Sequence, residues 1–172
     1  LISNILYELF TLFIYEVSPE LSENSFLSSS GRFFYECIVT DDGLCRVGWS
    51  TMRASYEIGT DAESFGFGGT GRASHKRQFD VYGDSFGLGD TVGCFLDLDN
   101  AAISWSKNGA NLGKAFDVPS HLIQAGLFPS VSLKNAELRF NFGATPFKYP
   151  QAGWLAIGSA EKEQLIISSK FG

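Results

Sequence analysis

Four short segments in a fixed order constrain the fold of this chain most strongly. They are GRFFYE (residues 31–36), RVGWS (46–50), GDTVGCFLDLD (89–99) and WSKNG (105–109). Each is rich in aromatic or β-branched residues and is bounded by Gly, Asn or Asp, as is typical of strands between tight turns. Regular strands without the spacing of β–α–β units predict a mostly all-β protein, an antiparallel sandwich of two sheets.

The composition agrees with many short strands. The chain of 172 residues has 19 Gly, 5 Pro and 16 Phe, which suits strands joined by turns with positive φ better than long helices. The net charge of −6 argues against a uniformly basic nucleic-acid-binding surface, but a local basic patch keeps its own field. Cys37, Cys45 and Cys94 form no CxxC pair, which predicts reduced core thiols in an intracellular protein.

The first 17 residues are strongly apolar and are predicted to form an amphipathic helix. The apolar side chains that recur at helical spacing are Ile2, Ile5, Leu6, Leu9 and Phe13. The segment has no Lys or Arg, and Glu8 lies in its middle, which argues against a signal peptide or a membrane anchor. We therefore expect this helix to dock on a protein surface.

The rest of the chain divides into a polar linker at 18–30, the sandwich at 31–149 and an irregular tail at 150–172. Asn108-Gly109 supplies the pair of positive φ angles that a type I′ hairpin needs. Lys134-Asn135, between the apolar runs 128–133 and 137–142, predicts a second hairpin.

The alternation within CRVGWS (45–50) predicts one buried face and one more hydrated face. Trp49 falls on the buried face, while Arg46 falls on the hydrated one. Trp49, Trp105 and Tyr35 could also stack on nucleic-acid bases, but the alternation favours a core position for both Trp residues.

Three motifs suggest catalysis or ligand binding, and each has a simpler interpretation. GFGGTG (66–71) matches the dinucleotide fingerprint, but the residues that follow it, RASHKRQF (72–79), have no apolar helical stripe. Arg72-Ala73 also stands where a P-loop needs Lys-Ser/Thr. GDSFG (83–87) matches a nucleophile elbow around Ser85 but leads into a strand. The oxygens of Asp97, Asp99 and Asn100 suggest a cation site, yet the Gly and terminal Glu of a calcium loop are missing. No catalytic, cofactor or metal site is therefore predicted.

A cluster of basic residues is the strongest binding candidate. Its members on one glycine-rich loop are Arg72, His75, Lys76 and Arg77, and those that could join it are Arg46 and Arg53. Such a patch can hold phosphate oxygens or an acidic peptide through charge-assisted hydrogen bonds. The alternative is a solvated loop whose charges only promote solubility.

These segments, together with FGFGGTG (65–71), resemble the SPRY domain from residue 31 to about 149. The middle run resembles a subgroup from nuclear RNA-associated proteins, and most closely the SPRY insert of a DEAD-box RNA helicase. Residues 1–10 are similar to the helix after the phosphate-binding loop of such a helicase, and 147–156 resemble the return from the insert. SPRY domains usually have strands before the GRFFYE equivalent, so either these are missing here or residues 11–26 replace them.

The resemblance implies a protein or RNA interaction module that grips its partner with loops at one end of the sandwich. A protein or acidic peptide is the expected partner, RNA is the second candidate, and no membrane contact is expected. The chain has no GKT-type loop and no DEAD tetrapeptide, so it is not expected to be an enzyme by itself. ATP and Mg²⁺ would belong only to a parent helicase, in the nucleus or cytoplasm. Two alternatives remain open: a fragment of an ATP-dependent RNA helicase, and a stand-alone SPRY adaptor.

Overall fold

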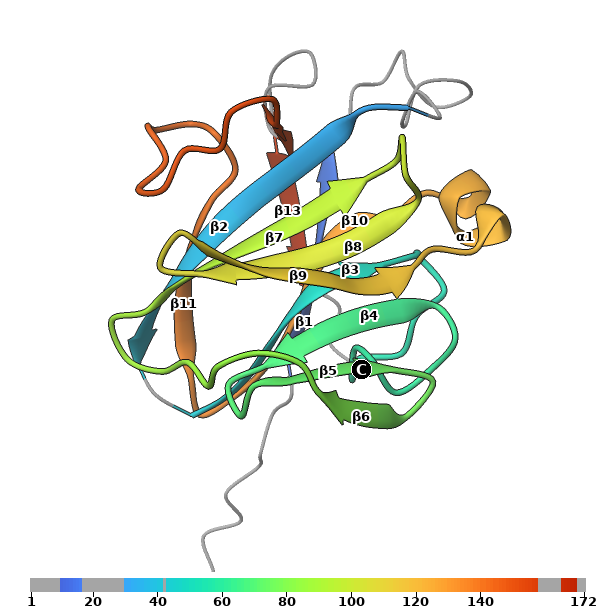
Figure 1. Cartoon of the computed structure of the whole chain (residues 1–172). Coiled ribbons are helices and arrows are strands. Elements are labelled where there is room, and N and C mark those ends of the chain that lie inside the picture. Colours follow the sequence, from blue (N-terminus) through green and yellow to red (C-terminus); the bar gives the residue numbers. More distant parts are fainter. Residues whose placement is uncertain (1–9, 17–29, 42, 158–164, 170–172) are drawn as a thin grey trace, which may run out of the picture.

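Two β-sheets lie face to face in the computed structural model, which describes residues 10–16, 30–41, 43–157 and 165–169 (Figure 1). Among these residues the first sheet has, in spatial order, β13 (Leu165–Ser169), β1 (Phe10–Glu16), β10 (Phe128–Lys134), β3 (Leu44–Ser50), β4 (Ser64–Gly68), β5 (Arg72–His75) and β6 (Gln78–Val81). The second sheet has β11 (Glu137–Asn141), β2 (Arg32–Asp41), β7 (Thr91–Asp97), β8 (Ala102–Lys107) and β9 (Ala110–Asp117), with β12 (Leu155–Ala156) parallel to β2. Apart from the β2–β12 pair, the strand pairs of the described residues are antiparallel, so the predicted two-sheet sandwich is confirmed.

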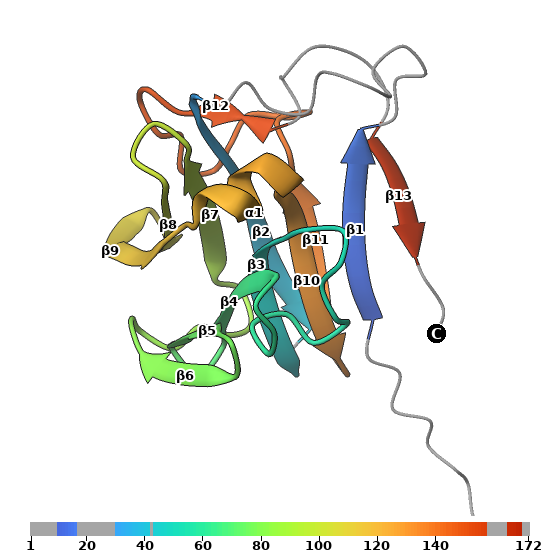
Figure 2. The ribbon, with the colours of Figure 1, turned by 90° about the vertical axis from the view of Figure 1, so that its right-hand side faces the viewer.

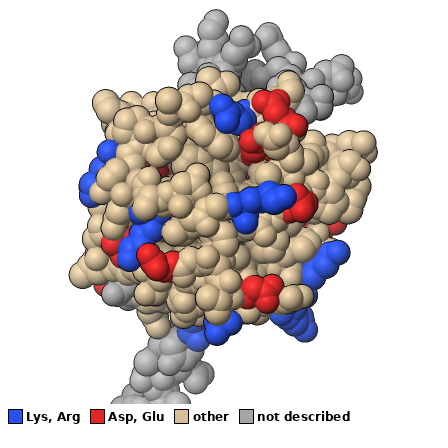
Figure 3. Space-filling model, in the orientation of Figure 1, with Lys and Arg blue, Asp and Glu red and all other residues tan. Residues whose placement is uncertain are grey.

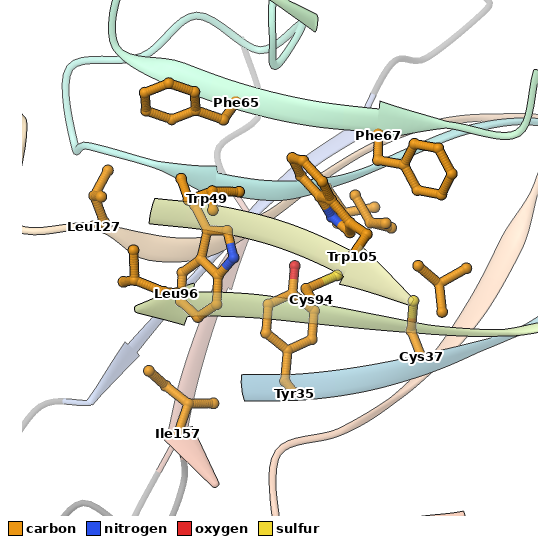
Figure 4. Close-up of a cluster of buried hydrophobic side chains, with 14 of the residues drawn as sticks. Tyr35, Cys37, Trp49, Phe65, Phe67, Cys94, Leu96, Trp105, Leu127 and Ile157 are labelled. Atoms are coloured by element: carbon orange, nitrogen blue, oxygen red, sulfur yellow. The ribbon is translucent and has the colours of Figure 1, made fainter. Parts of the chain in front are cut away.

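The core is a layer of aromatic, aliphatic and thiol side chains between the sheets (Figure 4). Trp49 from β3, Trp105 from β8 and Tyr35 from β2 all point into this layer, and each is completely buried. The predicted core position of both Trp residues is therefore confirmed. The three Cys residues are also buried, as predicted for core thiols, and they form no disulfide with one another.

The outer face of the first sheet is covered in its centre by the loop 51–63. Ile58 of this loop is fully buried, and its backbone N–H donates to Ser132 Oγ at 3.0 Å. Gly48 and Ser50 lie beneath the loop and are buried too, so the predicted hydrated face of β3 is wrong at these two positions. Only Arg46 of that face remains half-buried, because the loop leaves the first part of β3 uncovered.

One of the two predicted hairpins is confirmed and the other is wrong. Asn108 and Gly109 have φ angles of 48° and 83° and join the paired strands β8 and β9. Asn135 also has a positive φ, of 52°, but the strands on either side of it do not pair. β10 pairs with β3 and β11 pairs with β2, so the chain crosses from one sheet to the other at this point.

The N-terminal segment forms a strand where the sequence predicted a helix. Residues 10–16 are β1, which pairs antiparallel with β10 and with β13 (Figure 2). β13 comes from the tail that was expected to be irregular, so that expectation is corrected as well. The remaining residues of the predicted helix, 1–9, and most of the predicted linker, 17–29, lie outside the described residues. The helix of the described part is α1 (Ser120–Ala125).

Candidate functional site: a basic groove beside β6

The six basic residues that were predicted to bind a partner fall into four places. They are Arg46, Arg72, Lys76, Arg77, His75 and Arg53. Arg46 and Arg72 line one groove, and Lys76 and Arg77 form the turn between β5 and β6. His75 packs against the core, and Arg53 lies in the loop 51–63 that covers the outer face. Figure 3 shows Lys and Arg groups along the lower edge of the molecule, where Figure 1 draws β5 and β6.

The groove has a volume of about 370 Å³ and lies on the outer face of the first sheet. We define this basic groove by six of its lining residues: Leu44, Arg46, Gly68, Thr70, Arg72 and Phe79. Two of these are guanidinium side chains, and two are large apolar side chains that are partly exposed. The groove can therefore offer positive charge and apolar contact to the same ligand.

Arg46 is the central cation of the groove. Its Nη1 donates to the carbonyl of Ile58 at 2.9 Å, and its guanidinium carbon lies 4.9 Å from the centre of the Phe79 ring. Partial burial lowers the pKa of Arg46, while the charge of Glu57 acts in the opposite direction. Among the described residues, no salt bridge within 4.0 Å joins Arg46 to a carboxylate. A partly desolvated cation of this kind is stabilised when an anion binds beside it.

A glycine makes room for Arg46 on the sheet. A Cβ atom at Gly66 would lie 2.6 Å from Cδ of Arg46, so any larger residue would displace the stem of the arginine. Gly71 has a φ of 81°, and a Cβ there would lie 2.4 Å from the carbonyl oxygen of Gly83. The glycines of the sequence FGFGGTG therefore shape a groove and a tight turn. β4 leads directly into β5 of the same sheet and not into a helix, which excludes the dinucleotide interpretation.

Arg72 is the exposed cation of the groove. Its Nη1 donates to the carbonyl of Phe79 at 3.2 Å, which holds the guanidinium across β6. No salt bridge to a carboxylate occupies it within the described part of the chain. A guanidinium has five N–H donors, so most of them remain available to a ligand.

Lys76 and Arg77 extend the positive surface at the tip of the β5–β6 hairpin. Their φ angles of 51° and 65° give a two-residue turn with both central residues in the left-handed region. The backbone N–H of Lys76 donates to the carbonyl of Asp61 at 2.9 Å, and that of Arg77 donates to the carbonyl of Gly59 at 3.1 Å. These bonds fix the tip against the loop 51–63 and leave both side chains exposed.

His75 and Arg53 are set apart from the groove. The His75 ring stacks on the buried ring of Phe65 at 4.2 Å, and its Nδ1 lies 2.8 Å from the carbonyl oxygen of Ser64. Arg53 is exposed, and its Nε lies 3.7 Å from Oε2 of Glu63. The structure therefore brings Arg46 and Arg72 together and gives His75 a position in the packing.

The packing of His75 predicts a pH dependence of stability. Burial lowers the pKa of His75 from its ordinary value of 6.5, and the charge of Lys76 acts in the same direction. The hydrogen bond to Ser64 and the charge of Asp61 act in the opposite direction. Because the folded-state pKa is the lower one, the unfolded chain takes up the proton first as the pH falls.

We therefore expect the free energy of unfolding to decrease as the pH falls below about 6.5, the ordinary pKa of histidine. Urea midpoints at about pH 7.5 and about pH 5.5 measure this decrease, and His75→Gln is expected to reduce it. The substitution His121→Gln is the control, because His121 is exposed on α1. An unchanged decrease in His75→Gln would contradict the assignment.

The other sequence motifs have structural roles. Asp97 accepts hydrogen bonds from the backbone N–H and the side-chain Nδ2 of Asn100, and Asp99 accepts one from the N–H of Gly31. Ser85 lies in a loop that leads to β7, so no elbow between a strand and a helix is formed. Within the described residues, no group of three or more His, Cys, Asp or Glu side chains is placed to hold a metal ion.

The apolar part of the groove was not predicted from the sequence. Leu44 and Phe79 are 46% and 36% exposed, and Val81 on the same face of β6 is 79% exposed. The alternation in QFDV (78–81) was the sequence feature that indicates this apolar surface, since Phe79 and Val81 share one face of a strand. Their exposure depends on β6 being the last strand of the sheet, which only the tertiary structure shows.

A second hollow, of about 400 Å³, lies over β2 and β11 and was also not predicted from the sequence. Its lining includes the cations Arg139 and Lys148. The buried carboxylate of Glu36 accepts hydrogen bonds from the backbone N–H groups of Lys148 and Tyr149. That carboxylate therefore holds the segment after β11 onto the sheet. Separately, no helix of the described residues is long and apolar enough to cross a membrane.

Comparison with known proteins places this site in a family context. The chain is 50% identical over 145 residues to the ATP-dependent RNA helicase DDX1 of Xenopus laevis and 53% identical over 134 residues to Ddx1 of Drosophila melanogaster. These matches cover 84% and 77% of this chain but only 20% and 18% of the relatives, so the chain spans about a fifth of their length.

A probable ATP-dependent RNA helicase, ddx1 of Dictyostelium discoideum, is 47% identical over 134 residues, or 77% of this chain and 17% of the relative. The profile of the SPRY domain matches residues 32–145, which run from the start of β2 past the end of β11. This match covers more than half of the chain and the part that carries the basic groove. The chain belongs to the SPRY domain family.

Proposed function

We propose that this SPRY domain is a recognition module that binds an acidic segment of a partner protein in the basic groove. The observation that carries the proposal is Arg46, a half-buried cation without a salt bridge to any described carboxylate, beside the exposed guanidinium of Arg72. The partly exposed rings and methyl groups of Phe79 and Leu44 add apolar contact next to these charges. A rigid sandwich carrying such a surface suits charge-complementary binding of a protein segment.

The positions of the aromatic side chains favour protein over RNA. Single-stranded nucleic acid is usually held by exposed aromatic rings on which bases stack. Here Trp49, Trp105 and Tyr35 are completely buried, and the exposed ring of Phe79 already carries the guanidinium of Arg46 on its face. RNA could still contact the cations, but the groove offers it no free stacking platform.

We further propose that the domain works within a longer RNA helicase. The support is the identity of about half of the aligned residues to proteins named ATP-dependent RNA helicases, of which this chain spans a fifth. The chain itself lacks the GKT and DEAD motifs, so ATP hydrolysis with Mg²⁺ would belong to other parts of that protein. In this arrangement the groove recruits a partner, and the helicase lobes act on RNA.

A charge reversal at the groove tests the recognition proposal. The probe is a fluorescein-labelled peptide of alternating Glu and Thr, about eight residues long, followed by fluorescence anisotropy. Arg72→Glu is expected to weaken its binding at least about tenfold, because a charge-assisted hydrogen bond becomes a repulsion. Lys114→Glu is the matched control, since Lys114 pairs with Asp117 on β9 and the substitution changes the net charge equally.

Equal weakening by both variants would contradict a specific role of the groove. An oligouridine of about 12 nucleotides is the second probe. The acidic-protein proposal is overturned in favour of RNA if this oligonucleotide binds more tightly than the peptide and is released by Arg72→Glu.

A further inference from the structure

Among the described residues, the strand next to the basic groove, β6, forms one edge of the first sheet. β6 pairs with β5 on one side, and in the described part of the chain it is the last strand of its sheet. All four of its residues are exposed. In Figure 2, β6 lies at the side of the molecule away from β1 and β13, which form the opposite edge. An exposed edge strand is a template for pairing with another chain.

The pairing of β5 with β6 determines which backbone groups face the open edge. The turn has two residues, so the flanking pair His75 and Gln78 exchanges hydrogen bonds, and the next bonded pair is Ala73 with Asp80. The N–H of Tyr82 donates to the carbonyl of Gly71 at 3.0 Å, which continues the same alternation. The N–H and C=O groups between these pairs must therefore point away from β5.

The groups that point outward belong to Phe79 and Val81, the two residues on the face of the basic groove. Arg72 pairs with Val81 in the register, and its Nη1 donates to the outward carbonyl of Phe79. A guanidinium thus lies at the edge itself, and the cations of the hairpin tip continue along the same hairpin. The acid of this strand, Asp80, lies on the opposite face, where it accepts hydrogen bonds from Nε2 of Gln78.

Two of the features that block strand addition are absent from β6. It contains no Pro, and its register with β5 runs without a bulge from Arg72–Val81 to His75–Gln78. The positive charge beside this edge also argues against pairing with a second copy of the same strand, because such pairing would bring two sets of basic side chains together. An acidic chain has the complementary charge.

We propose that β6 binds its acidic partner segment by β-strand addition, with the partner as a new edge strand. This inference depends on the recognition module proposed above and names the way in which its ligand is held. The main-chain groups of Phe79 and Val81 supply the affinity, and the alternate side chains of the partner face the basic groove. Carboxylates at these alternate positions meet Arg72, while the small side chains between them lie on the other face.

Amide hydrogen exchange of the peptide complex tests this directly, with the same Glu-Thr peptide as the probe. In strand addition, exchange of the Phe79 and Val81 amides slows at least about tenfold on binding, because their N–H groups gain partners. The amides of Gln78 and Asp80 already bond to β5 and are expected to change much less. This alternation with a period of two residues is not expected for binding by side chains alone.

A proline substitution gives the second test. Val81→Pro removes an N–H group that faces the open edge, so it breaks no bond to β5 and is tolerated at an edge. It is expected to weaken peptide binding at least about tenfold, whereas Val81→Thr, which keeps the N–H, changes binding by less than about threefold.

The two proposals fail in different ways. If Arg72→Glu weakens binding but the Phe79 and Val81 amides keep their exchange rates in the complex, strand addition is wrong and the recognition module stands. If the peptide does not bind the unsubstituted protein, or Arg72→Glu leaves binding unchanged, the recognition module fails and strand addition with it. Both proposals are supported if the Phe79 and Val81 amides are protected in the complex of the unsubstituted protein and Val81→Pro abolishes peptide binding.

Discussion

Replacing Trp105 with alanine is expected to lower the free energy of unfolding by about 4 kcal/mol. Trp105 on β8 is fully buried between the sheets. Its ring centre lies 5.7 Å from that of Phe67 in the opposite sheet and 5.8 Å from that of Tyr82. Truncation would leave a large cavity between two rigid sheets that cannot close over it, so both the transfer free energy and the packing contacts are lost.

The matched variant Trp105→Phe separates ring packing from the indole nitrogen. Trp105 Nε1 is buried and has no hydrogen-bond partner among the described residues, so losing this group removes no bond within that part. We expect Trp105→Phe to cost about 1 kcal/mol, the size of a partial loss of volume. Denaturant unfolding measures both variants, and similar losses for alanine and phenylalanine would contradict the account.

Gly48→Ala is expected to destabilise the protein by about 3 kcal/mol, although it adds a single methyl group. A Cβ at this position would lie 1.9 Å from the carbonyl oxygen of Phe65, and that oxygen belongs to the backbone of the neighbouring strand. β3 and β4 would have to move apart. The buried hydroxyl of Tyr35 donates to the carbonyl of Gly48 at 2.7 Å, so a shift of β3 would disturb that bond as well.

Gly68→Ala on β4 is the control for this prediction. A Cβ there would lie 3.7 Å from the carbonyl oxygen of Cys45 and 3.9 Å from that of Arg72, which are ordinary contact distances. We expect a change within about 0.5 kcal/mol. Thermal or urea unfolding of both variants checks the difference, and a tolerated Gly48→Ala would show that the two strands are less closely constrained than their geometry implies.

The contrast between the two predicted hairpins shows how far local sequence determines this fold. The turn at Asn108-Gly109 depends on two residues that adopt positive φ, and the strands beside it pair as predicted. Asn135 also adopts positive φ, yet β10 pairs with β3 and β11 with β2. A local turn can reverse the chain, but pairing depends on which distant strands offer matching edges and buried faces.

The N-terminal segment illustrates the same limit. The apolar spacing of its first 17 residues is compatible with one face of a helix, but its second part, FTLFIYE (10–16), is rich in aromatic and β-branched residues that also suit a strand. β1 pairs with β10 and β13, which are more than 100 residues away in the chain. Partners at that distance are invisible to a short sequence window.

The sequence by itself determined the class of fold, the core position of Trp49 and Trp105, and the family to which the chain belongs. Alternating side chains and positive-φ turns are local properties, so they can be recognised before any strand has a partner. Only the tertiary structure decided that Arg46 and Arg72 share a groove, that His75 turns toward the core, and that β6 ends its sheet. These features follow from the order of strands within the sheet, which is set by burial and pairing between segments far apart in the chain.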